Sequence, residues 1–473
     1  FMFPMLEMSG NKHRYIDEVL YIYNRTNPLN DDKVDHSMQL GFEREIRGKN
    51  KYDKISHGTD PLDLLNSKRF DIAAKTIYAK NRMKNTDSGF PAELYLEHLK
   101  VWNNLCEKFP EKVGEESFIN TFDDLLSDIN ANGFDSDKGK IPTIQGSAIN
   151  GAHRIASSIV TGNEVETYEG EISEGQYNCN FQYFKNKKNF VPTGLDELYL
   201  DEMALEFCRN KKNLYTITIF PSHDANITNI LSHINSKNEI IYCKRVTLND
   251  AGKTNFVHNL YHNEAWIGSK IAGYPGVNEK AALCFSKGND IYVTLVEEDN
   301  IDNMVRLKDE IRSMCNVGKH SVHINDTQEE TWRIASSIYN ENSVHYLNNK
   351  KIADTPNFDL YIEKYYAIIR DRDDKHDFCV DSSAVLSSFG LRDCRDLDFL
   401  HLKDIPPISY NVDCHNKEAT HYKEKKDDII YNPEFHFYFF GIKFASIGIV
   451  RDMKTERNEE KDKVDVRLME LVL

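Results

Sequence analysis

The hexapeptide RIASSI occurs twice in this chain, at residues 154–159 and 333–338. Each copy follows a short apolar run and a turn, which predicts a strand, a tight turn and the opening of a helix. In both copies the two isoleucines and the alanine recur at helical spacing, which predicts a buried apolar stripe. We therefore expect an α/β (α+β) chain in which packing explains the repeat, with a true duplication as the alternative.

The first copy has the features of an anion site. The extended run before it ends at Asn150 and Gly151, which can adopt positive φ, and the helix is expected to begin near Ala152. His153 and Arg154 then lie in the first turn, beside free N–H groups and the positive end of the helix dipole. This arrangement predicts a phosphate cradle. The alternative is structural, with His153 capping the helix and Arg154 pairing with a surface acid.

The pattern Asn-Gly-x-His-Arg-x-Ala in this stretch resembles the ParB/sulfiredoxin-like fold. In that family a turn of this kind binds nucleotide phosphate, and some members are kinases or nucleotide hydrolases. The resemblance implies that Asn150, Gly151, His153 and Arg154 contact a phosphate group.

The second copy differs at the start of its helix. Thr327-x-x-Glu330 forms a capping box, and Glu329 and Glu330 fill the first turn, where acidic side chains repel a phosphate. His320 and His323 lie three residues apart, and residues at that spacing in a regular strand face opposite sides. An anion site of the same kind as in the first copy and a two-histidine metal site are therefore not expected. Ligand contacts by Lys319, His320 and Asp326 at the end of the strand are the alternative to a purely structural role.

The most specific pattern in the chain is VDSSAVLSSFGLRDCRDLDFLHL, which starts at Val380. It is predicted to form a strand, a turn, a short helix and a second strand that carries Asp396 and Asp398. Residues two apart in a strand face the same side, so these two carboxylates project together. Adjacent carboxylates repel each other unless a cation lies between them, and Mg²⁺ with a triphosphate is the usual occupant. Ser382 and Ser383 begin the short helix, where hydroxyls and exposed N–H groups can hold phosphate oxygens.

This order of elements resembles the nucleotidyltransferase (polymerase-beta-like) fold. The signature of that family is a Gly-Ser or Gly-Gly turn followed by Asp-x-Asp, and here the turn is Ser-Ser. The stretch KTERNEEKDKVD matches a helix common in small members of the fold, which implies phosphate contacts for Lys454, Arg457 and Lys461. The family takes a third carboxylate from a later strand, and Glu434 is the first candidate for it and Asp428 the second.

Composition limits the class of protein. With 59 basic against 75 acidic residues the net charge is −16, which argues against a nucleic-acid partner because such binding needs concentrated Lys and Arg. The longest apolar stretch, from Phe435, contains a His and a Lys and is too short to cross a membrane. Nine scattered cysteines without a CxxC pair favour free thiols in a reducing compartment, so a cytoplasmic location is expected.

Length predicts several domains, because 473 residues exceed what one core usually holds. Residues 1–36 resemble the end of a GT-A glycosyltransferase domain, through PMLEMSG and LYIYNRTNPLND. The resemblance implies a nucleotide-sugar domain upstream of Phe1 in the same polypeptide. The remaining divisions are expected to be a linker over 37–70, a ParB/sulfiredoxin-like region over 71–235, a second α/β region over 236–350 and a nucleotidyltransferase-like domain over 354–473.

Together the resemblances imply a multidomain transferase of surface glycan assembly. The present part would transfer a phosphoryl or nucleotidyl group with Mg²⁺, with Asp396, Asp398 and Glu434 as catalytic carboxylates and the first two as metal ligands. A nucleoside triphosphate or nucleotide sugar would be one substrate, and a sugar or glycan the other. The alternative is a non-catalytic accessory module that binds nucleotide or glycan on a degenerate nucleotidyltransferase fold. A third hypothesis is a nucleotidyltransferase that acts on RNA or protein, and the negative net charge disfavours it.

Overall fold

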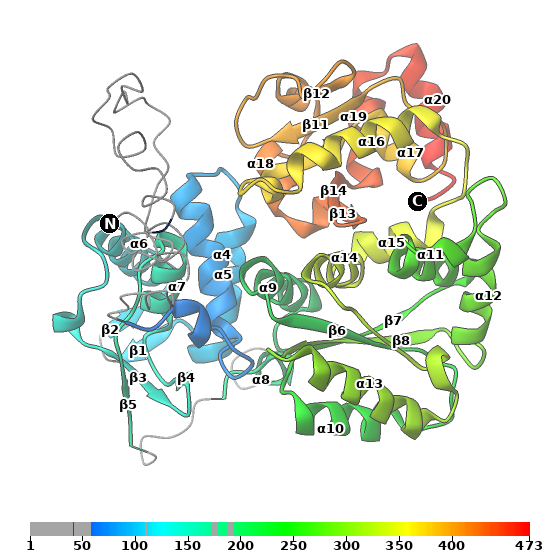
Figure 1. Cartoon of the computed structure of the whole chain (residues 1–473). Coiled ribbons are helices and arrows are strands. Elements are labelled where there is room, and N and C mark those ends of the chain that lie inside the picture. The colour runs from blue at the N-terminus through cyan, green and yellow to red at the C-terminus, as the bar shows by residue number, and fades with distance from the viewer. Residues whose placement is uncertain (1–40, 42–57, 109–110, 172–177, 187–192) are drawn as a thin grey trace. The chain divides into compact units, whose positions relative to one another are not determined.

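The computed structural model describes residues 41, 58–108, 111–171, 178–186 and 193–473, and the chain divides into two compact units, Phe1–Thr59 and Asp60–Leu473. The segment that resembles a GT-A domain, and most of the expected linker, lie outside the described residues. Within its described residues the second unit contains three sheets of three to five strands and one separate hairpin, with helices packed on the sheets (Figure 1). Its class is therefore mixed α/β, as the periodicity of the sequence predicts.

The first region of this unit combines a layer of helices with a small sheet. Its elements are η1 Pro61–Leu64, α4 Asp71–Lys84, α5 Phe90–Asn103, β1 Cys106–Lys108, β2 Glu111–Val113, α6 Glu115–Asn132, η2 Ser136–Lys138, β3 Ile141–Ile144, β4 Ser147–Ala148, α7 Ala152–Thr161, β5 Thr167–Glu169 and α8 Phe181–Asn186. The sheet has the order β4-β3-β5, in which β3 runs antiparallel to β4 and parallel to β5. Helices α4, α5, α6 and α7 share a core around Tyr78, Tyr95 and Phe122.

The second region is an antiparallel sheet covered on both faces. Its elements are α9 Glu197–Asn210, β6 Leu214–Ile219, α10 Ile227–Lys237, β7 Ile240–Thr247, α11 Asp250–Tyr261, η4 Ala265–Ile267, α12 Pro275–Cys284, β8 Asp290–Glu297, α13 Ile301–Cys315, η5 Gly318–His320, β9 Val322–Ile324, α14 Gln328–Ile338 and α15 Glu341–Asn349. The strand order is β7-β8-β6-β9. Figure 1 shows α10 and α13 on one face of this sheet and α9 and α14 on the other. The expected boundary at 235/236 falls inside α10, between two strands of one sheet, so this region begins earlier than the sequence indicated.

The C-terminal region is built on a mixed five-stranded sheet. Its elements are α16 Pro356–Ile369, η6 Lys375–Asp377, β10 Phe378–Asp381, α17 Ser383–Ser388, β11 Leu397–His401, β12 Val412–Cys414, η7 Asn416–His421, α18 Lys426–Tyr431, η8 Pro433–Phe435, β13 His436–Phe439, β14 Ile442–Ala445, α19 Ile447–Arg457 and α20 Glu460–Met469. The strand order is β12-β11-β10-β14-β13. β10 is antiparallel to β11 and parallel to β14. The sheet is therefore mixed, and β10 pairs with a strand that lies far from it in the sequence.

The C-terminal sheet packs directly on the second region. Tyr346 of α15 is fully buried against the rings of Phe389 and Phe437, with ring centroids 4.8 and 4.6 Å apart. Trp332 of α14 donates from Nε1 to the carbonyl oxygen of Gly441, in the turn between β13 and β14, at 2.9 Å. These contacts explain why residues 60–473 form one compact unit.

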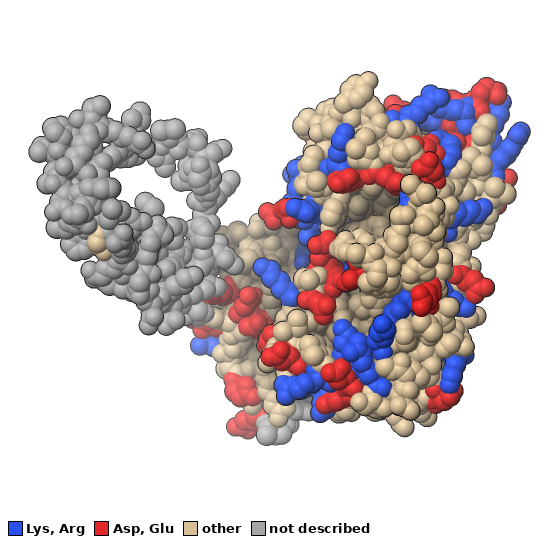
Figure 2. All heavy atoms as spheres, turned by 45° about the vertical axis from the view of Figure 1, so that its right-hand side comes forward, with Lys and Arg blue, Asp and Glu red and all other residues tan. Residues whose placement is uncertain are grey.

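The surface carries both signs of charge. On the face seen in Figure 2, Lys and Arg side chains are interspersed with Asp and Glu, and neither sign forms a continuous field. Among the helices that the structure describes, none combines the length and the apolar composition needed to cross a membrane.

Candidate functional site

Three aspartates lie side by side in the C-terminal sheet. Pairing of β10 with β11 sets Asp381 opposite Asp398, and pairing of β11 with β12 sets Asp398 opposite Asp413. Directly paired residues project from the same face of a sheet, so the three carboxylates share one face. Leu397 and Phe399 alternate to the other face, where they are buried in the core.

Burial and mutual repulsion change the protonation of this cluster. The pKa of Asp398 is raised to about 6, first by burial and then by the negative charges of Asp396, Asp381 and Asp413, against the opposing influence of His415. His415 Nδ1 lies 3.5 Å from Asp381 Oδ2. Although burial disfavours its cation, the carboxylates of Asp381 and Asp398 raise the pKa of His415. The crowded negative charge makes this face a place where a cation is favoured.

The turn after β10 has a backbone conformation that favours glycine. Ser382 has φ 55° and ψ −128°, is only 5 % exposed, and donates from its N–H to Asp381 Oδ1 at 2.5 Å. Residues other than glycine are rarely held in such a conformation, and those that are cluster at functional sites. Within the described residues, Ser383 Oγ and Asp381 Oδ2 are buried without a hydrogen-bond partner. The two serines predicted to hold phosphate thus directly follow the first aspartate of the cluster.

The basic residues expected to contact phosphate lie on two helices, because the predicted helix breaks at Asn458, which has φ 53°. Lys454 of α19 is buried, with its Nζ 3.2 Å from Asp462 and 3.0 Å from Asp465 of α20. Arg457 Nη2 lies 2.7 Å from Asp462 Oδ1. Carboxylates of the same region therefore already pair with both cations.

Arg457 nevertheless lies near the aspartate cluster. The hydroxyl of Tyr422 donates to Asp381 Oδ1. Burial raises the pKa of this hydroxyl, and the positive charge of Arg457 lowers it, so Arg457 is close enough to influence a partner of Asp381. Lys461 lies apart, because its side chain is 69 % exposed and pairs with Glu459 at 3.0 Å.

The two candidates for the third carboxylate do not join the aspartates. Glu434 lies in η8, just before β13, which is at the opposite edge of the sheet from β12. Asp428 accepts a hydrogen bond from the backbone N–H of Gly89, in the first region. The carboxylate that the structure sets directly opposite Asp398 on the neighbouring strand is instead Asp413. The signal in the sequence was the alternation Asp413-x-His415, which could be interpreted only once the pairing of β12 with β11 was known.

Across the described residues, no group of three or more His, Cys, Asp or Glu side chains is arranged to hold a metal ion. The aspartates of the C-terminal sheet therefore do not form a complete protein cage. They present carboxylates on one face of the sheet.

The first RIASSI helix, α7, begins at the predicted turn. Gly151 has φ 86°, a conformation that favours glycine, and a Cβ at this position would lie 2.5 Å from Ile141 Cδ1 and would have to displace the end of that side chain. Asn150 is exposed, and its Oδ1 accepts a hydrogen bond from the N–H of Gly151 at 2.6 Å.

The two charged or titratable side chains of this turn have structural partners. His153 Nε2 lies 2.9 Å from the hydroxyl of Tyr95, and burial lowers the pKa of this histidine well below its usual value. Arg154 donates from Nη1 to the carbonyl oxygen of Gly139 and stacks on Phe134, with its guanidinium carbon 5.7 Å from the ring centroid. The structural alternative does not hold in detail either, because His153 contacts Tyr95 rather than capping the helix and Arg154 donates to a backbone carbonyl rather than pairing with a surface acid.

A cavity of about 610 Å³ lies at the start of α7. The residues of the turn that line it are Asn150, Gly151 and His153. Its polar wall was not predicted: Asp71 lies 2.9 Å from Arg69 Nε and 2.8 Å from Lys75 Nζ, all three being buried. Lys75 Nζ also lies 3.0 Å from His98 Nε2. Arg69 and Lys75 thus both pair with Asp71 in this wall.

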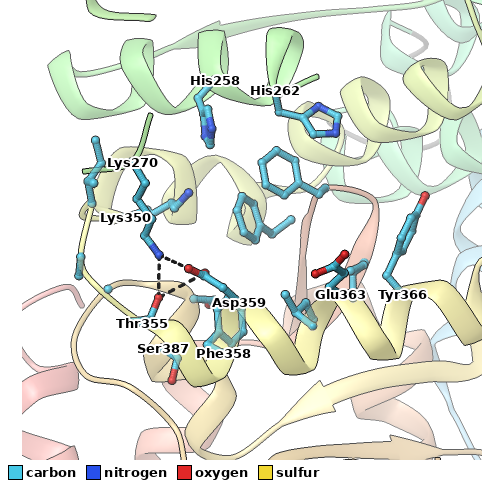
Figure 3. A pocket seen from close by; sticks show the side chains of 18 of the residues that line it. His258, His262, Lys270, Lys350, Thr355, Phe358, Asp359, Glu363, Tyr366 and Ser387 are labelled. Carbon is cyan, nitrogen blue, oxygen red and sulfur yellow. Dashed lines mark hydrogen bonds and ion pairs between the residues drawn. The ribbon is translucent and has the colours of Figure 1, made fainter. Parts of the chain in front are cut away.

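Another cavity, of about 320 Å³, lies between α11 and α16 (Figure 3). On one wall Lys270 Nζ contacts Asp359 Oδ2 at 2.6 Å and Thr355 Oγ1 at 3.1 Å. Lys350 Nζ lies 4.2 Å from the ring centroid of Phe439, and burial, together with the charge of Lys270, lowers the pKa of Lys350 to about 7. No motif predicted this cavity, because its walls come from segments that only the packing of the C-terminal sheet brings together.

Comparison of the chain with protein-family models, with curated proteins and with solved structures finds no match. The geometry of its own residues therefore carries the functional argument.

Proposed function

We propose that the C-terminal sheet binds a nucleotide together with Mg²⁺ and transfers a phosphoryl or nucleotidyl group. The observation that carries this proposal is the alignment of Asp381, Asp398 and Asp413 on three neighbouring strands, directly beside the strained turn at Ser382. The resemblance to the nucleotidyltransferase fold, which has a turn and an acidic strand in this order, supports it.

The residues present fit a magnesium nucleotide. Asp398, together with Asp396 in the exposed bend just before β11, would hold the ion. Burial first and then the like charges of its neighbours raise the pKa of Asp398, and a cation would offset those charges. Mg²⁺ takes only one or two carboxylates from the protein in nucleotide sites, so the lack of a complete protein cage is compatible with it. When bound, the ion would neutralise and orient the phosphates. Ser383 Oγ, which is buried without a partner in the described part of the chain, would donate to a phosphate oxygen, and Arg457 would offset charge on the transferred group.

Isothermal titration of the chain with ATP, CTP and UTP, with and without Mg²⁺, tests this proposal. We expect binding that requires the metal and that Asp396→Asn and Asp398→Asn each weaken about tenfold or more. Glu456→Gln removes one negative charge at an exposed position of α19 and should leave binding unchanged. The absence of any binding that depends on the metal, or equal metal-dependent binding by all variants, would contradict the proposal.

The alternative is a non-catalytic module that binds nucleotide or glycan. The observation that favours it is the internal pairing of Lys454 and Arg457 with Asp462 and Asp465, which leaves less positive charge for a triphosphate. The two functions differ in product: incubation with a labelled nucleoside triphosphate and Mg²⁺ yields a transferred label only from the enzyme. A module would bind and release the nucleotide unchanged, and Asp396→Asn would not affect its binding.

We also propose that the acceptor is a sugar or glycan and that the protein works in the cytoplasm. Residues 1–36, which resemble the end of a glycosyltransferase domain, support the acceptor. All nine cysteines are free thiols, which suits a reducing compartment. Supplying sugar phosphates, RNA and a protein extract as competing acceptors for the labelled group tests this choice, and label on RNA or protein alone would overturn it.

A further inference from the structure

A third cavity, of about 610 Å³, lies beside β9, the edge strand of the four-stranded sheet. Its walls come from the end of α11, from α12 and α13, from the turn η5 and from α14. The proposed nucleotide site lies on a different sheet, so this cavity needs its own explanation.

Four cations surround His323 of β9. The pKa of this histidine is lowered to about 3, first by burial and then by the positive charges of Lys308, Arg333, Lys280 and Arg312. These four residues belong to three different helices and all line the cavity. His323 lines the same cavity, so the fold brings the four positive charges close to this one histidine.

Two of these cations have no carboxylate within ion-pair distance in the part of the chain that the structure describes. Lys280 Nζ instead donates to the carbonyl oxygen of Lys319 at 2.7 Å, and Lys308 Nζ donates to that of Ile324 at 3.0 Å. Burial lowers the pKa of both ammonium groups. Because charges removed from water are usually paired, two such ammonium groups indicate that this wall is completed by an anion.

Several buried nitrogen atoms at this wall are also without a hydrogen-bond partner among the described residues. They are His323 Nε2, Arg312 Nε and Arg333 Nε. Arg333 is only 4 % exposed. Buried donors are nearly always bonded, so the two guanidinium nitrogens favour a ligand that offers acceptor oxygens.

The carboxylates of the cavity do not cancel this charge. Glu330 lies 3.3 Å from Arg333 and accepts a hydrogen bond from the N–H of Asp326 at 2.9 Å, so its oxygens are engaged. Glu264, Glu279 and Asp326 are exposed, where water and salt screen them. The buried and half-buried part of the wall therefore has an excess of positive charge.

An aromatic surface adjoins the cations. The ring centroid of Tyr261 lies 5.1 Å from that of Trp266 and 5.1 Å from that of His323. Lys280 Nζ lies 5.6 Å from the centroid of Tyr261. Trp266 is 45 % exposed, so one of its faces is open to a ligand. Rings of this kind pack on bases and on the apolar faces of sugars.

We infer that this cavity binds an organic phosphate, with the phosphate among Lys280, Lys308 and Arg312 and the attached base or sugar against Tyr261 and Trp266. A phosphate group carries enough negative charge to offset two unpaired ammonium groups, and its oxygens suit a guanidinium donor. The cavity would thus give the chain a second phosphate-binding site, independent of the aspartates.

Titration of the chain in the absence of divalent metal tests this inference. The probes are inorganic pyrophosphate, glucose 1-phosphate and ADP, which separate the charge of the phosphate from the contributions of a sugar and a base. At least one probe should bind, and Lys280→Gln and Lys308→Gln should each weaken its binding about tenfold or more. Lys287→Gln, which removes a lysine that pairs with Asp224 at the surface, is the matched control and should bind like the parent chain.

Two further variants keep the test decisive even where a buried lysine variant folds poorly. Trp266→Ala, at an exposed position, should weaken ADP or glucose 1-phosphate and leave pyrophosphate unchanged. Asp398→Asn should leave all three affinities unchanged. The inference fails if no probe binds the parent chain, if both folded lysine variants bind as well as the control, or if Asp398→Asn abolishes binding.

Discussion

Asp398 lies between Asp381 and Asp413 in the sheet, so its negative charge is unfavourable in the folded chain. Burial is the first cause of its pKa near 6, and the neighbouring carboxylates add to it, whereas the ordinary value is 3.8. The folded chain therefore binds a proton that the unfolded chain has already released between these two pH values. Stability falls as pH rises through this window, and the whole penalty is present above about pH 6.

Replacing Asp398 by Asn removes this penalty. We expect Asp398→Asn to be more stable than the parent chain at pH 7.5, by about 1–3 kcal/mol, and to lose the advantage as the pH falls towards 4. Thermal unfolding of both proteins between pH 4 and 8, without divalent metal, measures the difference. A stability difference that does not change with pH would show that the carboxylate is not crowded by its neighbours.

The turn at Ser382 gives a second prediction for a single residue. Its φ of 55° and ψ of −128° strain a serine but not a glycine. Ser382→Gly is therefore expected to raise the free energy of unfolding by about 1 kcal/mol, after the greater chain entropy of glycine is subtracted. Ser388→Gly, at the helical end of α17, is the control and should lower it by about 1 kcal/mol. Chemical denaturation of the parent chain and the two variants measures these differences. A lower free energy of unfolding in Ser382→Gly would show that the backbone at Ser382 is not strained.

At the scale of elements, the two RIASSI helices show how far the sequence determines the structure. The apolar stripe was predicted from spacing alone. Its members are buried as expected except Ile159, which is half-buried; the buried ones are Ile155, Ala156, Ile334, Ala335 and Ile338. Thr327 is the N-cap of α14, as predicted, because this signal is local. Local periodicity and capping chemistry thus identified the strands, turns and helices around each motif.

Partners from distant segments could not be read in the same way. His153 meets Tyr95 of α5, a contact that no spacing in the sequence encodes. His320 and His323 were expected on opposite sides of one strand, yet both line the cavity beside β9, because the strand begins at Val322 and His320 belongs to the turn before it. Asp413 joined the candidate site only through strand pairing. The sequence therefore indicated the types of side chain, whereas register and helix docking decided which of them meet.

The start of α7 allows a test of one such long-range contact. In Gly151→Ala the new Cβ must displace Ile141 and also adopt an unfavourable φ of 86°, so we expect a loss of about 2–4 kcal/mol. Gly146→Ala has a similar φ of 74° but no atom within 4 Å of the added Cβ. The difference between the two variants in urea denaturation isolates the contact with Ile141. Equal losses would mean that backbone strain alone requires the glycine.

At the scale of the whole described unit, the C-terminal sheet depends on the second region for part of its core. Tyr346 of α15 fills a space between Phe389 and Phe437, and Ser343 Oγ accepts a hydrogen bond from the N–H of Tyr438 at 2.8 Å. The walls of the cavity in Figure 3 come from both regions, so this cavity depends on their packing. We therefore expect residues 60–473 to unfold together.

Trp332 is the side chain through which this cooperativity can be tested. Its Nε1 donates to the carbonyl oxygen of Gly441, and its ring centroid lies 4.7 Å from that of His376 and 5.4 Å from that of Tyr438. Truncation removes these contacts and leaves a cavity, so Trp332→Ala should lower the free energy of unfolding by about 3–5 kcal/mol. Unfolding should remain a single transition when it is followed by both near-ultraviolet and far-ultraviolet circular dichroism.

The matched control for this variant is Trp266→Ala. Trp266 is 45 % exposed, and its ring packs against Tyr261 of α11 rather than against the C-terminal sheet. It should lower the free energy of unfolding by less than about 1 kcal/mol. A C-terminal region that melts separately in Trp332→Ala, while the rest keeps the stability of the parent chain, would show that the sheet folds on its own. In that case α14 and α15 would serve only as a platform for the C-terminal sheet, and the aspartates of that sheet would keep their geometry without the second region.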